Sequence, residues 1–178
     1  MKHIRIGVLA LAALILLPSA AVAQQPVGDV ADGNDSPGLL DISHFYGVKT
    51  VSDGPLTIRI HFFENVKSSM FTKSSKDKVS VYFDASPNYD GVADYTGIVR
   101  QTNSGDLEFL ISGSGSSFDP LKVTRPNRRE LKTIVPGNSP PNPNGPLEIK
   151  VKTVYVSTSG ACASGCQDRA PDSGWLLT

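Results

Sequence analysis

Residues 56–62 read Leu-Thr-Ile-Arg-Ile-His-Phe, and this alternation decides the fold class. An apolar side chain at every second position is typical of a strand with one buried face, because successive side chains of a strand point to opposite faces. The same period of two predicts further strands at residues 40–48, 79–83, 95–101, 107–111, 121–123, 131–135 and 149–156. The sequence therefore predicts an all-β protein of about eight strands.

The segments between these strands have the composition of turns. Examples are Ser52-Asp-Gly-Pro55 and Asn103-Ser-Gly-Asp106, and the chain contains 16 glycines and 13 prolines. Short strands separated by such turns are typical of sandwiches. We expect an antiparallel two-sheet β-sandwich that resembles a jelly roll. The apolar phase slips near Lys152 and Thr153, which predicts a β-bulge in the last long strand.

The first 23 residues have the pattern of a secretory signal peptide. Lys2 and Arg5 precede an uncharged apolar run over residues 6–17, and Ala21-Val22-Ala23 matches a cleavage signal. A helix of that length spans about 18 Å, less than a hydrocarbon core of about 30 Å. We expect residues 1–23 to be removed, residues 24–37 to be a flexible arm, and residues 38–178 to form the domain. The protein would be secreted by a bacterium into the periplasm or the medium.

The charge balance disfavours nucleic acid as a partner. The chain has 17 basic and 17 acidic residues, and loss of Lys2 and Arg5 leaves 15 basic residues. Phosphate backbones are bound by basic surfaces, which this composition does not predict. No second long apolar segment follows the signal peptide, so we expect no membrane span after cleavage.

Two cysteines, Cys162 and Cys166, lie in the secreted part of the chain. Export implies an oxidising compartment, so the sequence predicts a disulfide between them. The alternative is a redox or metal pair, although zinc sites commonly need four ligands.

Two groups of acidic residues have the chemistry of a calcium site, since this ion prefers carboxylate and carbonyl oxygens from loops. The first group alternates along one loop and contains Asp84, Ser86, Asn88 and Asp90. The second combines both ends of the domain, which could meet in a sandwich, and contains Asp32, Asp35, Asp41, Asp168 and Asp172. The alternative is that these residues serve turns and caps.

A glycan-binding face would need flat aromatic rings beside polar groups. The aromatic candidates are Tyr46, Phe63, Tyr82, Tyr89, Tyr95, Tyr155 and Trp175, and of these we favour Phe63, Tyr82, Tyr89 and Tyr95. The alternative is ordinary packing in the core or beneath a loop. We expect Trp175, the one tryptophan, to anchor the C-terminal tail.

The sequence contains few residues in patterns that indicate catalysis. The serine-rich segment 112–117 does not match a nucleophile elbow, and His44 and His61 are the only histidines outside the signal peptide. Spacing alone identifies no pair of acids for glycoside hydrolysis. We therefore expect a protein that is not an enzyme.

Short motifs spread over residues 35–174 resemble, in their order, secreted domains of the DOMON type, which are similar to family-nine carbohydrate-binding modules. The motifs are Asp35-Ser-Pro-Gly-Leu-Leu-Asp-Ile42, Val81-Tyr-Phe-Asp84 with Pro87-Asn88, Val92-Ala-Asp-Tyr95, Leu131-Lys-Thr-Ile-Val-Pro136 and Asp168-Arg-Ala-Pro-Asp-Ser-Gly174. The resemblance implies a two-sheet jelly roll that binds sugars or haem, often with structural calcium. This chain departs from it by having a single tryptophan and no identifiable Met/His pair for haem.

The sequence thus favours a secreted, non-catalytic module that binds a glycan or another small extracellular ligand, with calcium as a candidate stabilising ion. Two alternatives remain. One is a structural or protein-interaction domain of the cell envelope, which would bind an envelope protein. The other is a small secreted hydrolase or inhibitor, whose turnover would depend on His61 or on an acidic pair.

Overall fold

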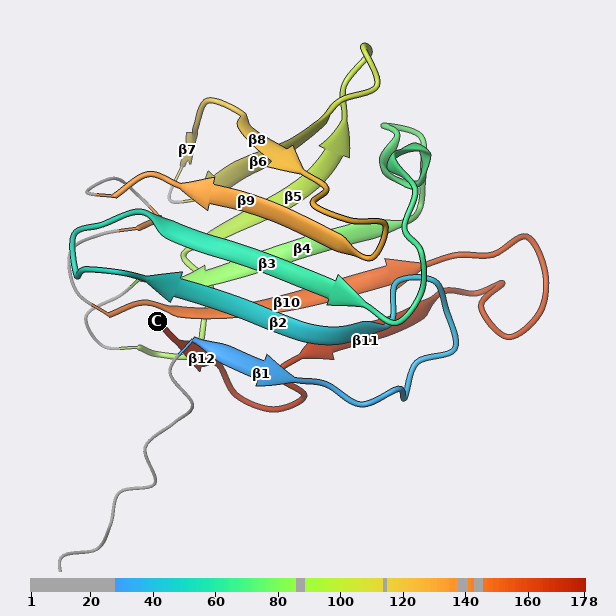
Figure 1. Cartoon of the computed structure of the whole chain (residues 1–178), viewed down its shortest axis with the longest axis horizontal. Coiled ribbons are helices and arrows are strands. Elements are labelled where there is room, and N and C mark those ends of the chain that lie inside the picture. Colours follow the sequence, from blue (N-terminus) through green and yellow to red (C-terminus); the bar gives the residue numbers. More distant parts are fainter. Residues whose placement is uncertain (1–27, 86–88, 114, 138–140, 143–145) are drawn as a thin grey trace, which may run out of the picture.

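The computed structural model describes residues 28–85, 89–113, 115–137, 141–142 and 146–178 (Figure 1). The predicted signal peptide lies outside these ranges, as does Asn88. Within them the protein is built from strands and one short 3-10 turn, Ser68–Phe71. The predicted all-β class is confirmed.

The described residues form twelve strands. In chain order they are β1 (Asp29–Ala31), β2 (Ile42–Lys49), β3 (Leu56–Phe62), β4 (Lys78–Asp84), β5 (Tyr95–Gln101), β6 (Leu107–Gly113), β7 (Ser116–Ser117), β8 (Leu121–Thr124), β9 (Glu130–Val135), β10 (Glu148–Tyr155), β11 (Cys166–Ala170) and β12 (Leu176–Leu177).

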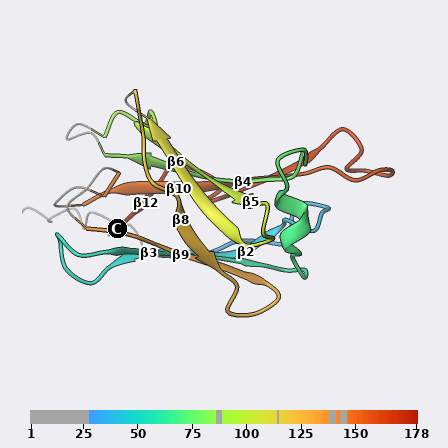
Figure 2. The same cartoon turned by 90° about the horizontal axis from the view of Figure 1, so that it is seen from above.

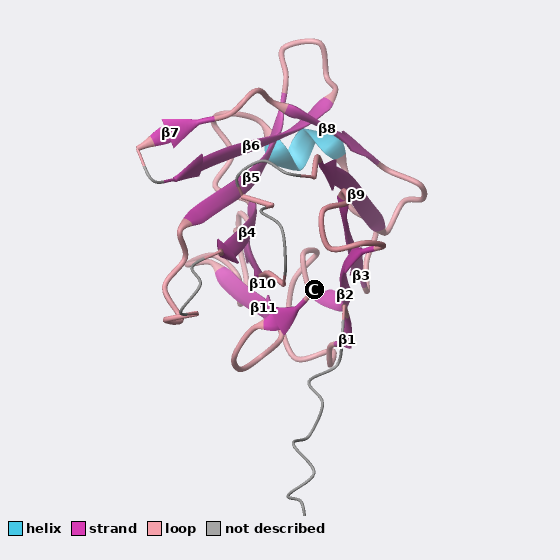
Figure 3. Ribbon diagram, turned by 90° about the vertical axis from the view of Figure 1, so that its left-hand side faces the viewer, coloured by secondary structure: helices cyan, strands magenta, loops and turns pink. Residues whose placement is uncertain are grey.

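All these strands belong to one antiparallel sheet. The order is β1-β2-β3-β9-β8-β6-β5-β4-β10-β11, with β12 beside β10 and β7 beside β6. Figure 2 shows β3 and β9 on one side of the molecule and β4 and β10 on the other. Figure 3 shows the sheet curling round so that β11 returns towards β2, and these two strands lie in contact. The result is a nearly closed, barrel-like sheet.

The prediction of two separate sheets with about eight strands is therefore wrong in its finer part. β8 pairs with both β6 and β9, so hydrogen bonding continues from one side of the molecule to the other. Periodicity shows which face of each strand is buried, but it does not show which strand lies next to which. The additional strands, β1, β7, β11 and β12, are short, and they carry no clear alternation in the sequence.

The interior is filled by the apolar positions that alternate along the strands. In β3, every second side chain from Leu56 to Phe62 is buried, as the sequence predicts. The largest of the buried side chains are the rings of Phe45, Phe62, Phe71, Phe83 and Phe109. Phe83 and Phe109 meet edge to face with their ring centroids 6.3 Å apart. A single apolar core therefore lies inside the curled sheet.

The predicted bulge in the last long strand is also wrong. β10 pairs with β4 in continuous register from Glu148 to Val154, and Thr153 is buried. The Thr153 hydroxyl donates a hydrogen bond to the carbonyl oxygen of Leu40 at 2.7 Å, which allows a polar side chain to occupy an inward position. The register irregularity occurs instead between β2 and β3, between Ile42 and His44.

The segment expected to be a flexible arm takes part in the sheet. β1 pairs with β2, and the amide of Gly28 donates to the carbonyl oxygen of Leu177 at 3.0 Å. From residue 28 onwards, the chain is therefore bound to the domain rather than free of it. Residues 32–41 lie beside the C-terminal strands, since Asp32, Asp35 and Asp41 each place a carboxylate oxygen within 4.8 Å of one on Asp168.

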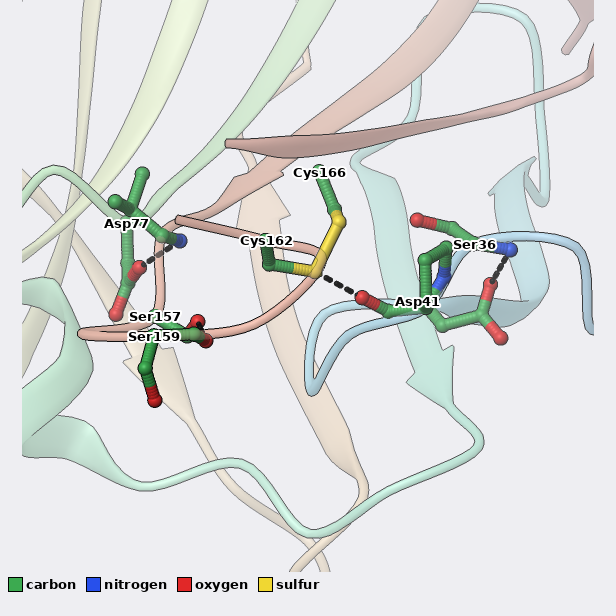
Figure 4. The surroundings of a disulfide bond; sticks show 9 residues. Ser36, Asp41, Asp77, Ser157, Ser159, Cys162 and Cys166 are labelled. Atoms are coloured by element: carbon green, nitrogen blue, oxygen red, sulfur yellow. Dashed lines mark hydrogen bonds between the residues drawn. A yellow bond between two sulfur atoms is a disulfide. The ribbon is translucent and has the colours of Figure 1, made fainter. Parts of the chain in front are cut away.

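The predicted disulfide is confirmed. A bond of 2.06 Å joins Cys162, in the loop after β10, to Cys166, the first residue of β11 (Figure 4). The sulfur of Cys162 lies against the carbonyl oxygen of Pro37. Nearby, the amide of Val156 donates to a carboxylate oxygen of Asp77 at 2.8 Å. The disulfide loop therefore packs on the segment that leads into β2.

Candidate metal and ligand site

Five aspartates from the two ends of the domain converge at the β2–β11 contact. Two groups of three place their carboxylate oxygens within 4.8 Å of one another, and Asp168 belongs to both. The first group is Asp32, Asp168 and Asp172, and the second is Asp35, Asp41 and Asp168. The structure thus brings together the second acidic set that the sequence suggested.

Backbone amides hold the two most buried carboxylates in place. Asp168 is 6% exposed and Asp41 is 2% exposed. Asp168 accepts hydrogen bonds from the amide of Ile42 at 2.6 Å and from its neighbour Arg169 at 2.7 Å. Asp41 accepts one from the amide of Ser36 at 3.3 Å, which Figure 4 also shows. Both side chains are therefore ordered by the fold itself.

The charges in this aspartate cluster are poorly compensated. Burial, followed by the nearby charges of Asp168 and Asp172, raises the pKa of Asp32 to about 7. Burial is also the main cause that raises the pKa of Asp41 to about 6, and it raises the pKa of Asp168. Desolvation and like charges both disfavour ionised carboxylates. A bound cation would remove this cost.

Two cations border the aspartate cluster, but within the part of the chain that the structure describes neither forms an ion pair with it. No ion pair given by the described residues ends on any of the five aspartates. One carboxylate oxygen of Asp32 is shielded from solvent and accepts no hydrogen bond from a residue that the structure describes. Lys152 and Arg169 line a hollow of about 330 Å³ beside Asp35, Asp168 and Asp172.

Two members of the first acidic set accept hydrogen bonds from backbone amides of their own loop. Asp84 accepts a hydrogen bond from the amide of Gly91 at 2.9 Å, and Asp90 accepts one from Val92 at 2.9 Å. Asp94 accepts one from the amide of Ala85 at 2.8 Å. Asn88 lies outside the described residues. Contacts of this kind are those expected of the alternative, in which these residues serve turns and caps.

The four favoured aromatic candidates do not share one face. Tyr95 packs on the core, edge to face with Phe118 at 5.8 Å between ring centroids. The hydroxyl of Tyr89 donates to the carbonyl oxygen of Pro146 at 2.7 Å. Half-buried Phe63 follows β3, where its amide donates to the carbonyl oxygen of Asp41 at 3.1 Å. Tyr82 alone among the four lines the cleft described next.

A cleft of about 560 Å³ lies over the outer face of β4 and β10. Its walls include Tyr82 from β4, Lys150 from β10 and the segment 171–175 that follows β11. The ammonium of Lys150 lies 4.0 Å from the ring centroid of Trp175 and 5.7 Å from that of Tyr82. Trp175 is thus a wall of the cleft, whereas the sequence analysis favoured a role as an anchor of the C-terminal tail. Its being the one tryptophan of the chain is the signal that could have indicated it.

The cleft and the aspartate cluster are neighbours. Asp172, Arg169 and Lys152 line both the cleft and the hollow at the cluster. Asp172 is exposed, unlike Asp168, so its carboxylate borders both places. An ion held by the cluster would therefore lie beside any ligand in the cleft.

The two histidines lie elsewhere, in a row across β2, β3 and β9. His44 pairs with His61, and His61 pairs with Glu130. Glu130 is 3% exposed, and its carboxylate is 3.7 Å from both His61 and Arg59. His44 contacts Asp29. The serines of residues 112–117 that the structure describes lie on the β6–β7 hairpin, which is not adjacent to β2 or β3 in the sheet.

Comparison of the chain with protein-family models, with curated proteins and with solved structures finds no match. Among the residues that the structure describes, no helix has the length and the apolar character needed to cross a membrane.

Proposed function

We propose that this protein is a secreted, non-catalytic binding module that holds a glycan in the cleft beside Trp175. The observation that carries the proposal is the cleft itself: about 560 Å³, with Tyr82, Trp175 and several polar side chains in its walls. Ligand sites commonly combine a concave surface and aromatic side chains with a few polar groups that fix orientation. Secretion rests on the pattern of residues 1–23.

The DOMON-type resemblance supports this proposal through its closing motif, residues 168–174, which covers the end of β11 and the cleft wall after it. The single continuous sheet differs from the two-sheet arrangement that the resemblance implies. The cleft, rather than the resemblance, therefore identifies the residues that would bind the glycan.

The test of this function is binding of the purified protein to a glycan panel by calorimetry. We expect Tyr82→Ala and Trp175→Ala each to weaken binding of any glycan that the protein retains, by about tenfold or more. Tyr46→Ala is the matched control, because Tyr46 is a half-buried tyrosine on β2 that does not line the cleft. Equal loss with Tyr46→Ala, or no loss with either cleft variant, would contradict the proposal.

Calcium is the ion that fits the aspartate cluster. Calcium binds oxygen ligands at about 2.3–2.6 Å, so oxygens on opposite sides of one ion are about 5 Å apart. The carboxylate oxygens of each group of three lie within 4.8 Å, a span that one such ion fills. Asp168, shared by both groups, would be the central ligand. The ion would neutralise the buried carboxylates and tie the segment before β2 to β11.

A thermal melt in calcium and in EDTA tests this part of the proposal. An ion that binds only the folded state raises the melting temperature by mass action, so we expect a rise of several degrees in millimolar calcium. Asp172→Asn, at an exposed position, should reduce that rise, whereas Asp119→Asn, at an exposed site outside the cluster, should not. An equal melting temperature with calcium and with EDTA would exclude the calcium site.

A further inference from the structure

Positive charge gathers in the cleft where the proposed function places a glycan. Lys150, Lys152 and Arg169 line it, and Asp172 is the one carboxylate among the described residues that do. The whole chain, in contrast, has equal numbers of basic and acidic residues. The charge of the cleft is therefore a local property, which the composition of the chain does not reveal.

The pairing of β10 with β11 brings two of these cationic residues close to each other. Lys152 of β10 lies directly opposite Arg169 of β11 in the antiparallel register. Like charges at directly opposed positions destabilise a pair of strands. No ion pair given by the described residues engages Lys150, Lys152 or Arg169. Asp35, Asp168 and Asp172 line a hollow with these two cations, and the calcium ion proposed for the cluster would neutralise those carboxylates. With that ion bound, an anionic group in the cleft would offset the repulsion between Lys152 and Arg169.

The third cation, Lys150, limits how Trp175 can contact a ligand. The Lys150 ammonium lies 4.0 Å from the ring centroid of Trp175, against one face of the indole. That face cannot at the same time stack on the apolar face of a neutral sugar. Instead, the two rings hold the ammonium in place by cation–π contact, and they present it as a fixed positive charge. The cleft is thus better suited to an anion than to a neutral ring.

We infer that the cleft binds acidic glycans, whose uronic acid carboxylates lie between Lys150 and the Lys152–Arg169 pair. This inference deepens the proposed function and rests on it. Charge-assisted hydrogen bonds from ammonium and guanidinium groups to carboxylates are stronger than those between neutral groups, so the carboxylate would account for most of the selectivity. The glycan rings would lie along Tyr82 and the residues after β11.

The test compares acidic glycans with the same glycans after removal of charge. The probes are short oligomers of galacturonate and of glucuronate, each beside its methyl ester, measured by calorimetry in calcium. We expect each acid to bind about tenfold or more tightly than its ester. Lys150→Gln and Arg169→Gln should abolish most of this preference, and Lys122→Gln, at an exposed lysine of β8, should leave it intact.

The outcomes separate this inference from the function on which it rests. Equal binding of acid and ester, or an unchanged preference in both cleft variants, overturns the acidic specificity and leaves glycan binding in place. No binding of any glycan on the wider panel overturns both. Because the substituted side chains lie on the surface, a melting temperature equal to that of the unaltered protein will show that each variant is folded.

Discussion

Gly97 illustrates how closely the interior of the sheet is packed. A Cβ atom added to Gly97 of β5 would lie 2.0 Å from the ring of Phe109, which is fully buried. Phe109 has little freedom to move away, because it packs edge to face on Phe83. The absence of a side chain at this position therefore allows the ring to fill the core.

We expect Gly97→Ala to lower the free energy of unfolding by about 1–3 kcal/mol, which is typical of overpacking in a core. Urea denaturation measures this change. Gly33→Ala is the matched control, since nothing lies within 4 Å of an added Cβ atom there. A similar effect in both variants would contradict the packing argument.

At the scale of elements, the disulfide loop supports the aspartate cluster from outside. The bond closes a short loop between β10 and β11, and its Cys162 end lies against Pro37. Pro37 lies between Asp35 and Asp41, both members of the cluster. The loop therefore restrains the segment that carries two of the proposed calcium ligands.

Replacement of both cysteines by serine should have two effects. The loss of a closed loop this short should lower the free energy of unfolding by about 2 kcal/mol on the chain-entropy model. Calcium should also bind more weakly, because its ligands would be less well ordered. Calorimetry with calcium measures the second effect, and an unchanged calcium affinity would show that the disulfide does not position the cluster.

At the scale of the whole molecule, the aspartate cluster should make stability depend on pH. The pKa of Asp32 is raised from 3.8 to about 7, and that of Asp41 is raised from 3.8 to about 6. At pH values between 3.8 and about 7, the metal-free folded state binds more protons than the unfolded state. The contribution of these groups to the free energy of unfolding therefore falls as the pH rises from about 4 to about 7.

In calcium, the stabilisation from the aspartate cluster should instead grow as the pH rises, because metal binding requires ionised ligands and releases protons. We expect the difference in melting temperature between calcium and EDTA to increase from about pH 5 to about pH 8. In Asp32→Asn, this increase should be smaller. Melting curves at several pH values measure it, and a difference that is constant with pH would show that the cluster does not take up the ion as proposed.

Alternation along the chain was enough to predict the all-β class, the main strands and the inward set of β3, because a period of two is a local property of a strand. The pairing of Cys162 with Cys166 was also predictable, since the two cysteines lie close together in the chain. Thr153 shows the limit of this approach. The break in the apolar pattern at this residue predicted a bulge, but the strand continues in register and Thr153 lies inside, where its hydroxyl donates to Leu40, 113 positions away.

What the sequence by itself determined is therefore local: the strands, the turns and the types of residue available as ligands. The tertiary structure alone decided that the strands form one curled sheet, that Asp41 and Asp168 are buried, and that Trp175, Lys150 and Tyr82 meet in a cleft. The physical reason is distance along the chain. The hydrogen bond from Ile42 to Asp168 joins residues 126 positions apart, and contacts of this kind depend on how the whole sheet curls.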